Sequence, residues 1–514
     1  MNYKPTIGLE VHVELKTNSK MFCSCLNDSN EHRPNVNICQ ICTAQPGSLP
    51  VINKEAVKKV VKTGLALNCN IPKESKFDRK NYFYPDLPKG YQISQYDKPF
   101  CKEGYLEIPV SEDFSKLQLK KIRIRRVHLE EDTGRLIHPE AADYSLVDFN
   151  RAGIPLMELV TEPDLDTGLE VRRFAEELQL ILRYLGVSDA DMEKGQMRVE
   201  VNISLAPYRT DLSRRETKFL LRGGSGAGFG EGKKMGTKVE IKNLNSFKAA
   251  ERAVNYEIER QTEILKNKGK IVQETRGWDD VKGITFSQRE KEEAHDYRYF
   301  PEPDLPPIIL GQDYIDKIRA EIPELPAGKR KRFAKEFGLD AKSIEIFTDN
   351  KDLGEYFEKI VSEFEPNLKP DKLKSLIKLA ANYLITDIQG ILEGKQFIEK
   401  DFKIDAENFA EFITLIEEGK ITSKTAKEIL LEMSKTGADP SNIIEEKELA
   451  QVSDESEIGK IVKEVISKNQ KAVEDFKKGK QNALQFLVGQ IMAQTRGRAK
   501  PEIVQKILKK ILSK

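Results

Sequence analysis

The stretch Gly8-Leu-Glu-Val-His-Val-Glu-Leu15 decides how the first part of this chain folds. Its apolar residues alternate with polar ones, which are Glu10, His12 and Glu14. A period of two is typical of a β-strand with one buried face. Two carboxylates and an imidazole on the other face can bind a metal ion or transfer protons, and a solvated charged face is the alternative. Residues elsewhere in the chain must decide between a functional site and a solvated strand face.

The composition indicates a globular protein of several domains. A chain of 514 residues exceeds one hydrophobic core, so we expect two to four domains. Its 84 Lys and Arg nearly balance 83 Asp and Glu, so an RNA partner would be bound by local patches or by shape. Neither a signal peptide nor a run of about 18 apolar residues is visible, which predicts a cytoplasmic protein without a membrane segment.

The periodicity changes near residue 295. Before it, alternating runs such as Gln118–Val127 are interrupted by helical stretches such as Gly168–Leu185. The segment Tyr299–Pro307 has four prolines in nine residues, which predicts a linker, and helical patterns dominate beyond it. We therefore predict an α+β fold, with a mixed, mainly antiparallel sheet domain over residues 1–295 and two all-helical domains over residues 296–403 and 404–514.

Four of the six cysteines lie within 20 residues, as Cys23-x-Cys25 and Cys39-x-x-Cys42. Two close pairs of thiolates suit tetrahedral zinc in a closed, structural site, so we predict a zinc loop over residues 23–42. The alternative is four free cysteines in a reducing compartment.

Carboxylates gather at two further places. His128-Leu-Glu130-Glu131-Asp132 follows an alternating run, and consecutive acids repel unless a cation offsets them. Glu158 stands inside the apolar segment Pro155–Val160, as either a solvent-facing strand residue or a buried ligand. With Glu10 and His12, Glu130 and Glu158 make an oxygen-rich set that suits magnesium, although the sequence leaves their convergence open.

The glycine-rich segment 223–234 does not match a P-loop, because Ala227 occupies the position of the first glycine and Lys234 that of the Ser or Thr. We interpret residues 223–232 as a surface loop without an assigned role. If this protein uses ATP, a fold without a standard phosphate motif binds it.

Eight segments together resemble the B subunits of the aspartyl/glutamyl-tRNA(Asn/Gln) amidotransferases. They span the chain and are Ile7–Leu15, Lys76–Pro99, His128–Arg135, Ser145–Asp164, Gly236–Phe247, Gln273–Arg276, Asp296–Pro303 and Phe486–Met492. The twenty-residue block Ser145–Asp164 is the most specific of them.

The resemblance implies a cradle-shaped catalytic domain, a helical domain and a helical tail that binds tRNA. It also implies a heterotrimer, in which an amidase-type A subunit releases ammonia from glutamine and a small C subunit wraps the other two. The B subunit would use ATP and Mg²⁺ to phosphorylate the side-chain carboxylate of Glu-tRNA(Gln) or Asp-tRNA(Asn), and ammonia would then attack.

The resemblance also assigns roles to individual residues. It places Glu10, His12, Glu130 and Glu158 as catalytic ligands of Mg²⁺, and Glu14 gains only a supporting or rim position. The ammonia path would include Lys80, Tyr82, Lys89 and Glu131, whose alternative interpretation is an ordinary surface around Asp78–Tyr91.

This chain departs from the family at Glu200, where members commonly have Asp. Many members lack the zinc cysteines, which favours a structural role for that metal. Two other functions stay open: a non-catalytic tRNA-binding scaffold, and a metal-dependent hydrolase acting alone. The hydrolase is disfavoured because no open zinc site or Ser-His-Asp set is visible in the sequence.

Overall fold

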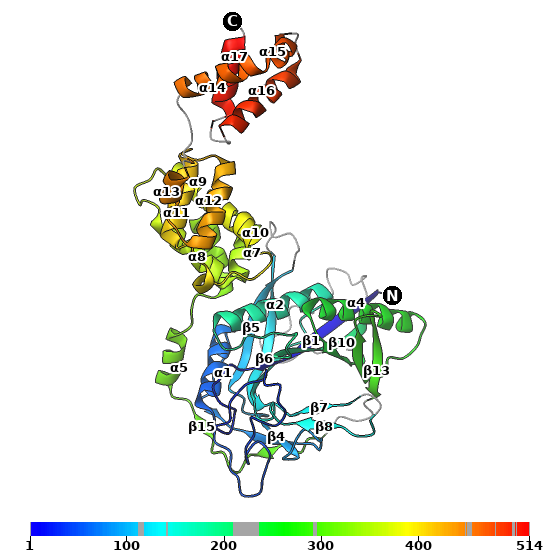
Figure 1. The fold of residues 1–514 in the computed structure, drawn as a ribbon. Helices are drawn as coiled ribbons and strands as arrows, with labels where there is room; N and C mark the ends of the chain where they lie inside the picture. Colours follow the sequence, from blue (N-terminus) through cyan, green and yellow to red (C-terminus); the bar gives the residue numbers. More distant parts are fainter. Residues whose placement is uncertain are drawn as a thin grey trace, which may run out of the picture. The chain divides into compact units, whose positions relative to one another are not determined.

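The computed structural model describes residues 2–110, 118–139, 142–208, 236–290, 296–447, 449, 455–477, 480–495, 499 and 501–512 (Figure 1). The glycine-rich segment 223–232 lies outside these residues. The chain forms two compact units, Met1–Pro326 and Ala327–Lys514. The first is built on a mixed sheet and the second on helices, so the predicted α+β fold class is confirmed.

An eight-stranded sheet organises the first unit. Its order is β13 (Ile284–Glu290), β12 (Glu274–Asp279), β11 (Val239–Leu244), β10 (Met197–Tyr208), β1 (Asn2–Glu14), β9 (Pro155–Thr161), β6 (Leu119–Glu131) and β5 (Cys101–Pro109). The described pairs are antiparallel except β11 with β12. That pair is parallel because helix α4 (Phe247–Lys266) makes the crossover between the two strands. The opening stretch of the sequence therefore lies in the middle of the sheet.

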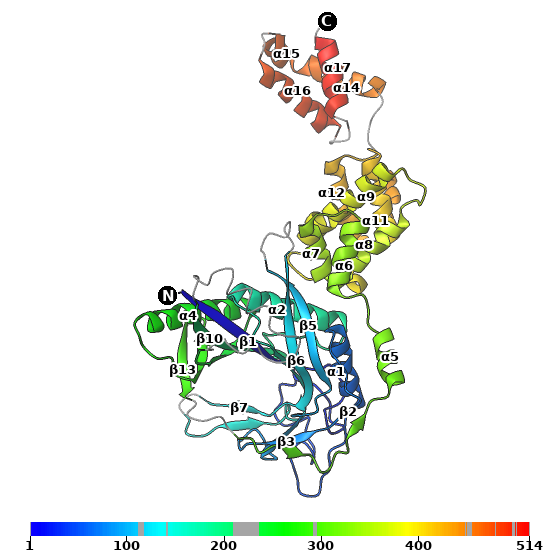
Figure 2. The ribbon, with the colours of Figure 1, turned by 180° about the vertical axis from the view of Figure 1, so that it is seen from behind.

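Helices cover one face of this sheet. Figures 1 and 2 show α2 (Gly168–Tyr184) and α4 lying across it, and α1 (Lys54–Ala66) packs against β5 and β6. The apolar side chains of β1 lie in this core, since Leu9, Val11 and Val13 are at most 1% exposed. The alternation in the sequence therefore reflects a strand with one buried face, as predicted. The polar residues Glu10, His12 and Glu14 face away from the helices.

Three small sheets lie on the side of the large sheet away from α2 and α4 (Figures 1 and 2). Strand β7 (Arg135–Ile137) pairs with β8 (Leu146–Asp148), and β2 (Glu74–Ser75) pairs with β15 (Ile308–Ile309). The third sheet has the order β14 (Phe300–Pro301), β3 (Asp78–Asn81) and β4 (Tyr91–Ser94). The polar face of the large sheet is turned toward these segments.

The proline-rich segment Tyr299–Pro307 is not a linker, so the predicted boundary at residue 295 is wrong. Strand β14 pairs with β3, and Arg79 Nε lies 2.7 Å from Glu302 Oε2. Helix α5 (Gln312–Ala320) packs on α1, and Lys58 Nζ lies 2.8 Å from Glu321 Oε2 just beyond it. Prolines are tolerated in a short edge strand, and the first unit therefore continues to Pro326.

The second unit contains two separate hydrophobic cores. The first joins buried residues from Phe333 to Ile443 and is formed by α6 (Pro326–Glu336), α7 (Ala341–Asp349), α8 (Lys351–Glu363), α9 (Pro370–Tyr383), the π-turn Leu384–Ile388, α10 (Gln389–Ile391), α11 (Ala406–Glu417), α12 (Ser423–Thr436) and α13 (Pro440–Glu446). The second runs from Ile458 to Leu512 and is formed by α14 (Glu455–Lys468), α15 (Gln470–Lys477), α16 (Gln481–Gln494) and α17 (Pro501–Leu512).

The predicted break near residue 403 falls inside the first of these cores. Tyr356 packs against Phe402 and Phe409 with ring centroids 5.6 and 6.1 Å apart, and its hydroxyl donates to the carbonyl oxygen of Ile404 at 3.0 Å. The cores divide instead between Leu449 and Ile458. Of the helices that the structure describes, none has the length and apolarity needed to span a membrane.

Candidate active site on the polar face of the sheet

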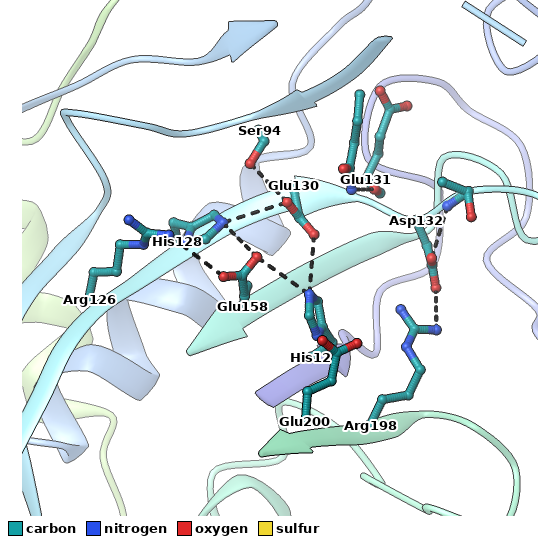
Figure 3. A network of polar contacts seen from close by, with 12 residues as sticks. His12, Ser94, Arg126, His128, Glu130, Glu131, Asp132, Glu158, Arg198 and Glu200 are labelled. Atoms are coloured by element: carbon teal, nitrogen blue, oxygen red, sulfur yellow. Dashed lines mark hydrogen bonds and ion pairs between the residues drawn. The ribbon is translucent and has the colours of Figure 1, made fainter. Parts of the chain in front are cut away.

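Strand register brings four polar residues into one row. His12 of β1 is paired with Arg198 of β10 on one side and with Glu158 of β9 on the other. Glu158 is in turn paired with His128 of β6. Directly opposed residues of antiparallel strands point to the same face, so the row crosses the sheet as Arg198, His12, Glu158 and His128 (Figure 3).

Two carboxylates and two imidazoles meet at the centre of this row. Glu158 Oε2 lies 3.4 Å from His12 Nε2 and 3.3 Å from His128 Nε2. Glu130, two residues beyond His128, places its oxygens 4.0 Å from His12 Nε2 and 3.5 Å from His128 Nε2 (Figure 3). Ser94 Oγ donates to Glu130 Oε2 at 2.8 Å. We call His12, His128, Glu130 and Glu158 the central cluster.

Burial and mutual charge set the protonation of the central cluster. Burial alone lowers the pKa of His128, but the charge of Glu158 and the hydrogen bond with Glu130 raise it to about 9. Burial opposes ionisation of Glu158, and the neighbouring imidazoles outweigh it, holding the pKa of Glu158 well below its usual range. The Nδ1 atoms of His12 and His128 are buried and have no hydrogen-bond partner in the described part of the chain. The cluster therefore holds charged carboxylates beside unsatisfied polar atoms, as binding sites do.

Three of its members fit a divalent cation. His12, Glu130 and Glu158 each offer one ligand atom, and these atoms lie within 4.8 Å of one another. Two carboxylates and one imidazole, completed by water, suit Mg²⁺ or Mn²⁺. Three of the four predicted ligands are thus brought together. His128 was not predicted as a site residue, although its spacing of two from Glu130 in an alternating run places both on one face of β6.

Glu10, the fourth predicted ligand, lies in a neighbouring group. It is paired with Glu200, and together with Glu240 they form a second set whose ligand atoms lie within 4.8 Å. Asn202 Nδ2 donates to Glu10 Oε1 at 2.9 Å, and Lys242 Nζ lies 3.0 Å from Glu200 Oε2. Burial and the charges of the nearby carboxylates raise the pKa of Glu10. The four predicted ligands are therefore divided between two adjacent groups. Glu10 lies in one, and His12, Glu130 and Glu158 lie in the other.

Glu14 is buried rather than at a rim. It is 7% exposed and lies near Asp132, which receives a hydrogen bond of 2.9 Å from Arg198 (Figure 3). Burial and the charge of Asp132 raise the pKa of Glu14 to about 7. Arg198, at the end of the row, thus contacts a third group of acids, which consists of Glu14 and Asp132.

The residues predicted for the ammonia path separate into two pairs. Lys80 lies beside the central cluster: its Nζ is 5.1 Å from the ring centre of Tyr297 and 5.9 Å from that of Tyr82, and the charges of Glu130 and Glu158 raise its pKa despite burial. Lys89 Nζ lies 2.7 Å from Glu131 Oε2, and the N–H of Ile93 donates to the other Glu131 oxygen at 3.0 Å.

The second pair lines a cavity of about 200 Å³. Its wall also includes Phe22, Cys42 and Gly153, so the cavity connects the Lys89–Glu131 ion pair to the loop that holds the cysteines. Of the four side chains predicted for the ammonia path, Glu131 is buried, and Lys80, Tyr82 and Lys89 are half-buried.

The four predicted zinc ligands converge. The Sγ atoms of Cys23, Cys25, Cys39 and Cys42 lie within 4.8 Å of one another. The Sγ of Cys42 is 3.8 Å from that of Cys25 and 3.7 Å from that of Cys39. A zinc–sulfur distance of about 2.3 Å gives a tetrahedral edge of about 3.8 Å, so the thiols already have the spacing of a closed zinc site.

Comparison with known proteins shows the family to which the chain belongs. A model of the GatB/GatE catalytic domain matches residues 5–316, and a model of the GatB domain matches residues 355–512. The chain is 48% identical to a protein of Persephonella marina over the full length of both chains. It is 47% identical to a protein of Caldicellulosiruptor saccharolyticus over both full lengths, and 46% identical to one of Thermotoga maritima over 99% of that protein. All three are named as the B subunit of an aspartyl/glutamyl-tRNA(Asn/Gln) amidotransferase. The chain therefore belongs to the family of aspartyl/glutamyl-tRNA(Asn/Gln) amidotransferase B subunits, as its eight sequence segments predicted.

Proposed function

We propose that this chain is the subunit that activates a mischarged tRNA for amidation. It would use ATP to phosphorylate the side-chain carboxylate of Glu-tRNA(Gln), Asp-tRNA(Asn) or both, and would then expose the product to ammonia. The observation that carries the proposal is the central cluster on the polar face of the sheet, in which His128, Glu130 and Glu158 are buried and His12 is half-buried.

The substrate carboxylate must first be activated, because it cannot expel oxide. The transfer of a phosphoryl group to it then needs charge compensation. A substrate carboxylate oxygen attacks the γ-phosphorus of ATP, ADP leaves, and an acyl phosphate forms. Ammonia then attacks the carbonyl carbon, phosphate leaves, and the amide remains after loss of a proton. A Mg²⁺ ion held by His12, Glu130 and Glu158 would neutralise charge on the phosphates.

Residues of the chain itself supply the remaining charges. The half-buried Lys80 has a raised pKa because of the charges of Glu130 and Glu158, and Arg126 Nη2 lies 3.8 Å from Glu158 Oε1. Both cations stand where phosphoryl oxygens would gather around the central cluster. The adjacent acidic group consists of Glu10, Glu200 and Glu240. Its charge would be balanced either by a second metal ion or by the ammonium of Lys242 alone.

We also propose a heterotrimer with an amidase-type A subunit and a small C subunit. The A subunit would release ammonia from glutamine, and the Lys89–Glu131 pair beside its 200 Å³ cavity lies on the path we assign to ammonia. Cys23, Cys25, Cys39 and Cys42 would hold a zinc ion that braces this wall and takes no part in the chemistry, because four sulfurs leave no open position.

The test is reconstitution. The chain is incubated with its A and C partners, glutamine, Mg-ATP and either Glu-tRNA(Gln) or Asp-tRNA(Asn). Formation of Gln-tRNA or Asn-tRNA, with one ADP released per amide, is expected. Inertness of both mischarged tRNAs contradicts the proposal. Binding of tRNA without Mg-dependent ADP release would favour the alternative, a tRNA-binding scaffold.

A further inference from the structure

Lys20 is buried in an unusual way. Its side chain is 0% exposed, and its Nζ donates to two backbone carbonyl oxygens, of Asn37 at 2.7 Å and of Phe149 at 3.3 Å. No carboxylate oxygen among the residues that the structure describes lies within 4.0 Å of this ammonium. Buried lysines are normally paired with an acid, because an isolated buried cation costs several kcal/mol.

Lys20 precedes the four cysteines in the sequence and contacts the loop that carries them. The N–H of Lys20 donates to the carbonyl oxygen of Cys25 at 2.9 Å, and its Nζ holds Asn37, two residues before Cys39. The Lys20 stem and Cys42 also pack against the same bare side of Gly153. A Cβ placed on Gly153 would lie 3.6 Å from Lys20 Cδ and 3.7 Å from Cys42 Cβ.

We propose that Lys20 is the counter-ion of a four-thiolate zinc centre, an inference that rests on the zinc site proposed above. Four thiolates around Zn²⁺ carry a net charge of −2, and a buried centre of that charge needs a cation nearby. The centre in turn supplies the negative charge that Lys20 otherwise lacks. Lys20 is a positioning and charge-compensating residue, and it does not bind the metal.

The same contacts extend beyond the zinc loop. Phe149 and Gly153 belong to the segment that leads into β9, and the N–H of Met21 donates to the carbonyl oxygen of Gly153 at 2.7 Å. Lys20 thus ties the cysteine loop to the strand that carries Glu158. Zinc binding therefore stabilises the link between the cysteine loop and β9 only while Lys20 carries its positive charge.

The experiment compares the full-length chain with Lys20→Met, which keeps the length of the stem and removes the charge. Lys16→Met is the matched control, since Lys16 pairs with Asp189 at an exposed site. Zinc content is measured by mass spectrometry, and the zinc dissociation constant by competition with a chromogenic chelator. We expect one zinc per wild-type chain, an affinity weakened tenfold or more by K20M, and a change of less than about twofold for K16M.

Thermal unfolding with and without zinc separates charge compensation from a purely structural role. In the zinc-loaded protein, K20M should lower the melting temperature. In the chelated protein the charge of −2 is gone, and K20M should lower the melting temperature by less than it does in the zinc-loaded protein. An equal loss in both states, or an unchanged zinc affinity, overturns the inference, because backbone bonding by Lys20 alone predicts that result.

Two controls keep the outcomes distinct. If K20M does not fold, the substitution is made in a Cys39→Ser/Cys42→Ser background, where it should cost less stability than in the zinc-loaded protein; an equal loss of folded protein there overturns the inference. Absence of zinc from the wild-type chain removes the zinc site and this inference together, while the ATP-dependent activity proposed above is tested independently by ADP release.

Discussion

At the scale of the residue, Glu158 is the most constrained carboxylate of the central cluster, because one of its oxygens is shared by His12 and His128. We predict that Glu158→Gln reduces Mg-dependent ADP formation on mischarged tRNA by about 100-fold or more, since it removes the charge that holds both imidazoles and one ligand of the proposed Mg²⁺. The rate is measured in the reconstituted complex. Glu162→Gln, which alters an ion pair with the exposed Arg125, is the control and should stay near the wild-type rate. A wild-type rate for E158Q would remove Glu158 from the site.

Glu10 allows a different prediction, because its pKa is raised by burial and by neighbouring carboxylates. Its ionised form therefore destabilises the folded state at neutral pH. Glu10→Gln should raise the free energy of unfolding by about 1 kcal/mol in metal-free buffer while lowering ATP-dependent activation. The hydrogen bond from Asn202 is retained by the amide oxygen. Urea denaturation at pH 7.5 with chelator gives the first quantity. A loss of stability would show that Glu10 is held by favourable contacts.

Residue patterns predicted part of this site. Alternation placed Glu10 and His12 on the polar face, and the cysteine spacing predicted four thiols that do converge. The division of the acids into two groups depends on the pairing of β1 with strands almost 150 and 190 residues away, which no local pattern encodes. Lys20 has no sequence signal of its own, because a buried lysine is recognised only from its surroundings.

At the scale of the element, Glu257 fixes helix α4 to strands β12 and β13. It is fully buried and accepts hydrogen bonds from Arg260, Gln261 and Thr285, and Arg276 Nε lies 3.1 Å from its Oε1. Burial raises the pKa of Glu257, but these hydrogen bonds and the charge of Arg260 lower it by more, so the net shift is downward. A lowered folded-state pKa gives stability that is present above the unfolded value of about 4.3 and is lost as the pH falls through the folded value.

We therefore predict that Glu257→Gln lowers the free energy of unfolding by about 3 kcal/mol at pH 7, because it leaves Arg260 and Arg276 facing a neutral amide. The difference between wild type and variant should shrink as the pH falls below about 4.3, where the wild-type carboxyl is partly protonated in the unfolded chain. Urea midpoints measured from pH 7 to pH 3.5 test both statements. A difference that is constant over this range would exclude ionisation of Glu257 as its source.

Most elements with strong periodicity were predictable, and those held by distant partners were not. The helix expected over Gly168–Leu185 is α2, which spans Gly168–Tyr184, and the run Gln118–Val127 lies almost wholly in β6. The parallel pairing of β11 with β12 was missed because it depends on the path of α4 rather than on residue pattern. The prolines of Tyr299–Pro307 suggested a linker, yet short edge strands accommodate them once β3 and β2 are in place.

At the scale of the whole molecule, the two helical cores determine where the chain can be divided. The helical periodicity predicted both modules but placed their boundary near residue 403, in the stretch between α10 and α11, which contains only the short 3-10 helix Glu399–Asp401. In the structure this stretch contributes Phe397, Phe402 and Ile404 to the core around Tyr356. A boundary is set by where apolar contacts stop, and they continue here to Leu449.

This gives a prediction about truncated chains. A chain ending at Leu449 keeps every residue of the first helical core, whereas one ending at Lys403 loses Phe409, Phe412 and Ile413, which are all 0% exposed. Each lost aromatic or aliphatic side chain removes about 2–3 kcal/mol of burial, more than the few kcal/mol by which a small helical core is stable. Limited proteolysis should therefore cleave residues 327–403 rapidly in the shorter chain and slowly in the longer one, with a matching loss of helical circular dichroism. Equal protease resistance of the two chains would place a true boundary at residue 403 and would mean that α11 packs on a core already complete without it.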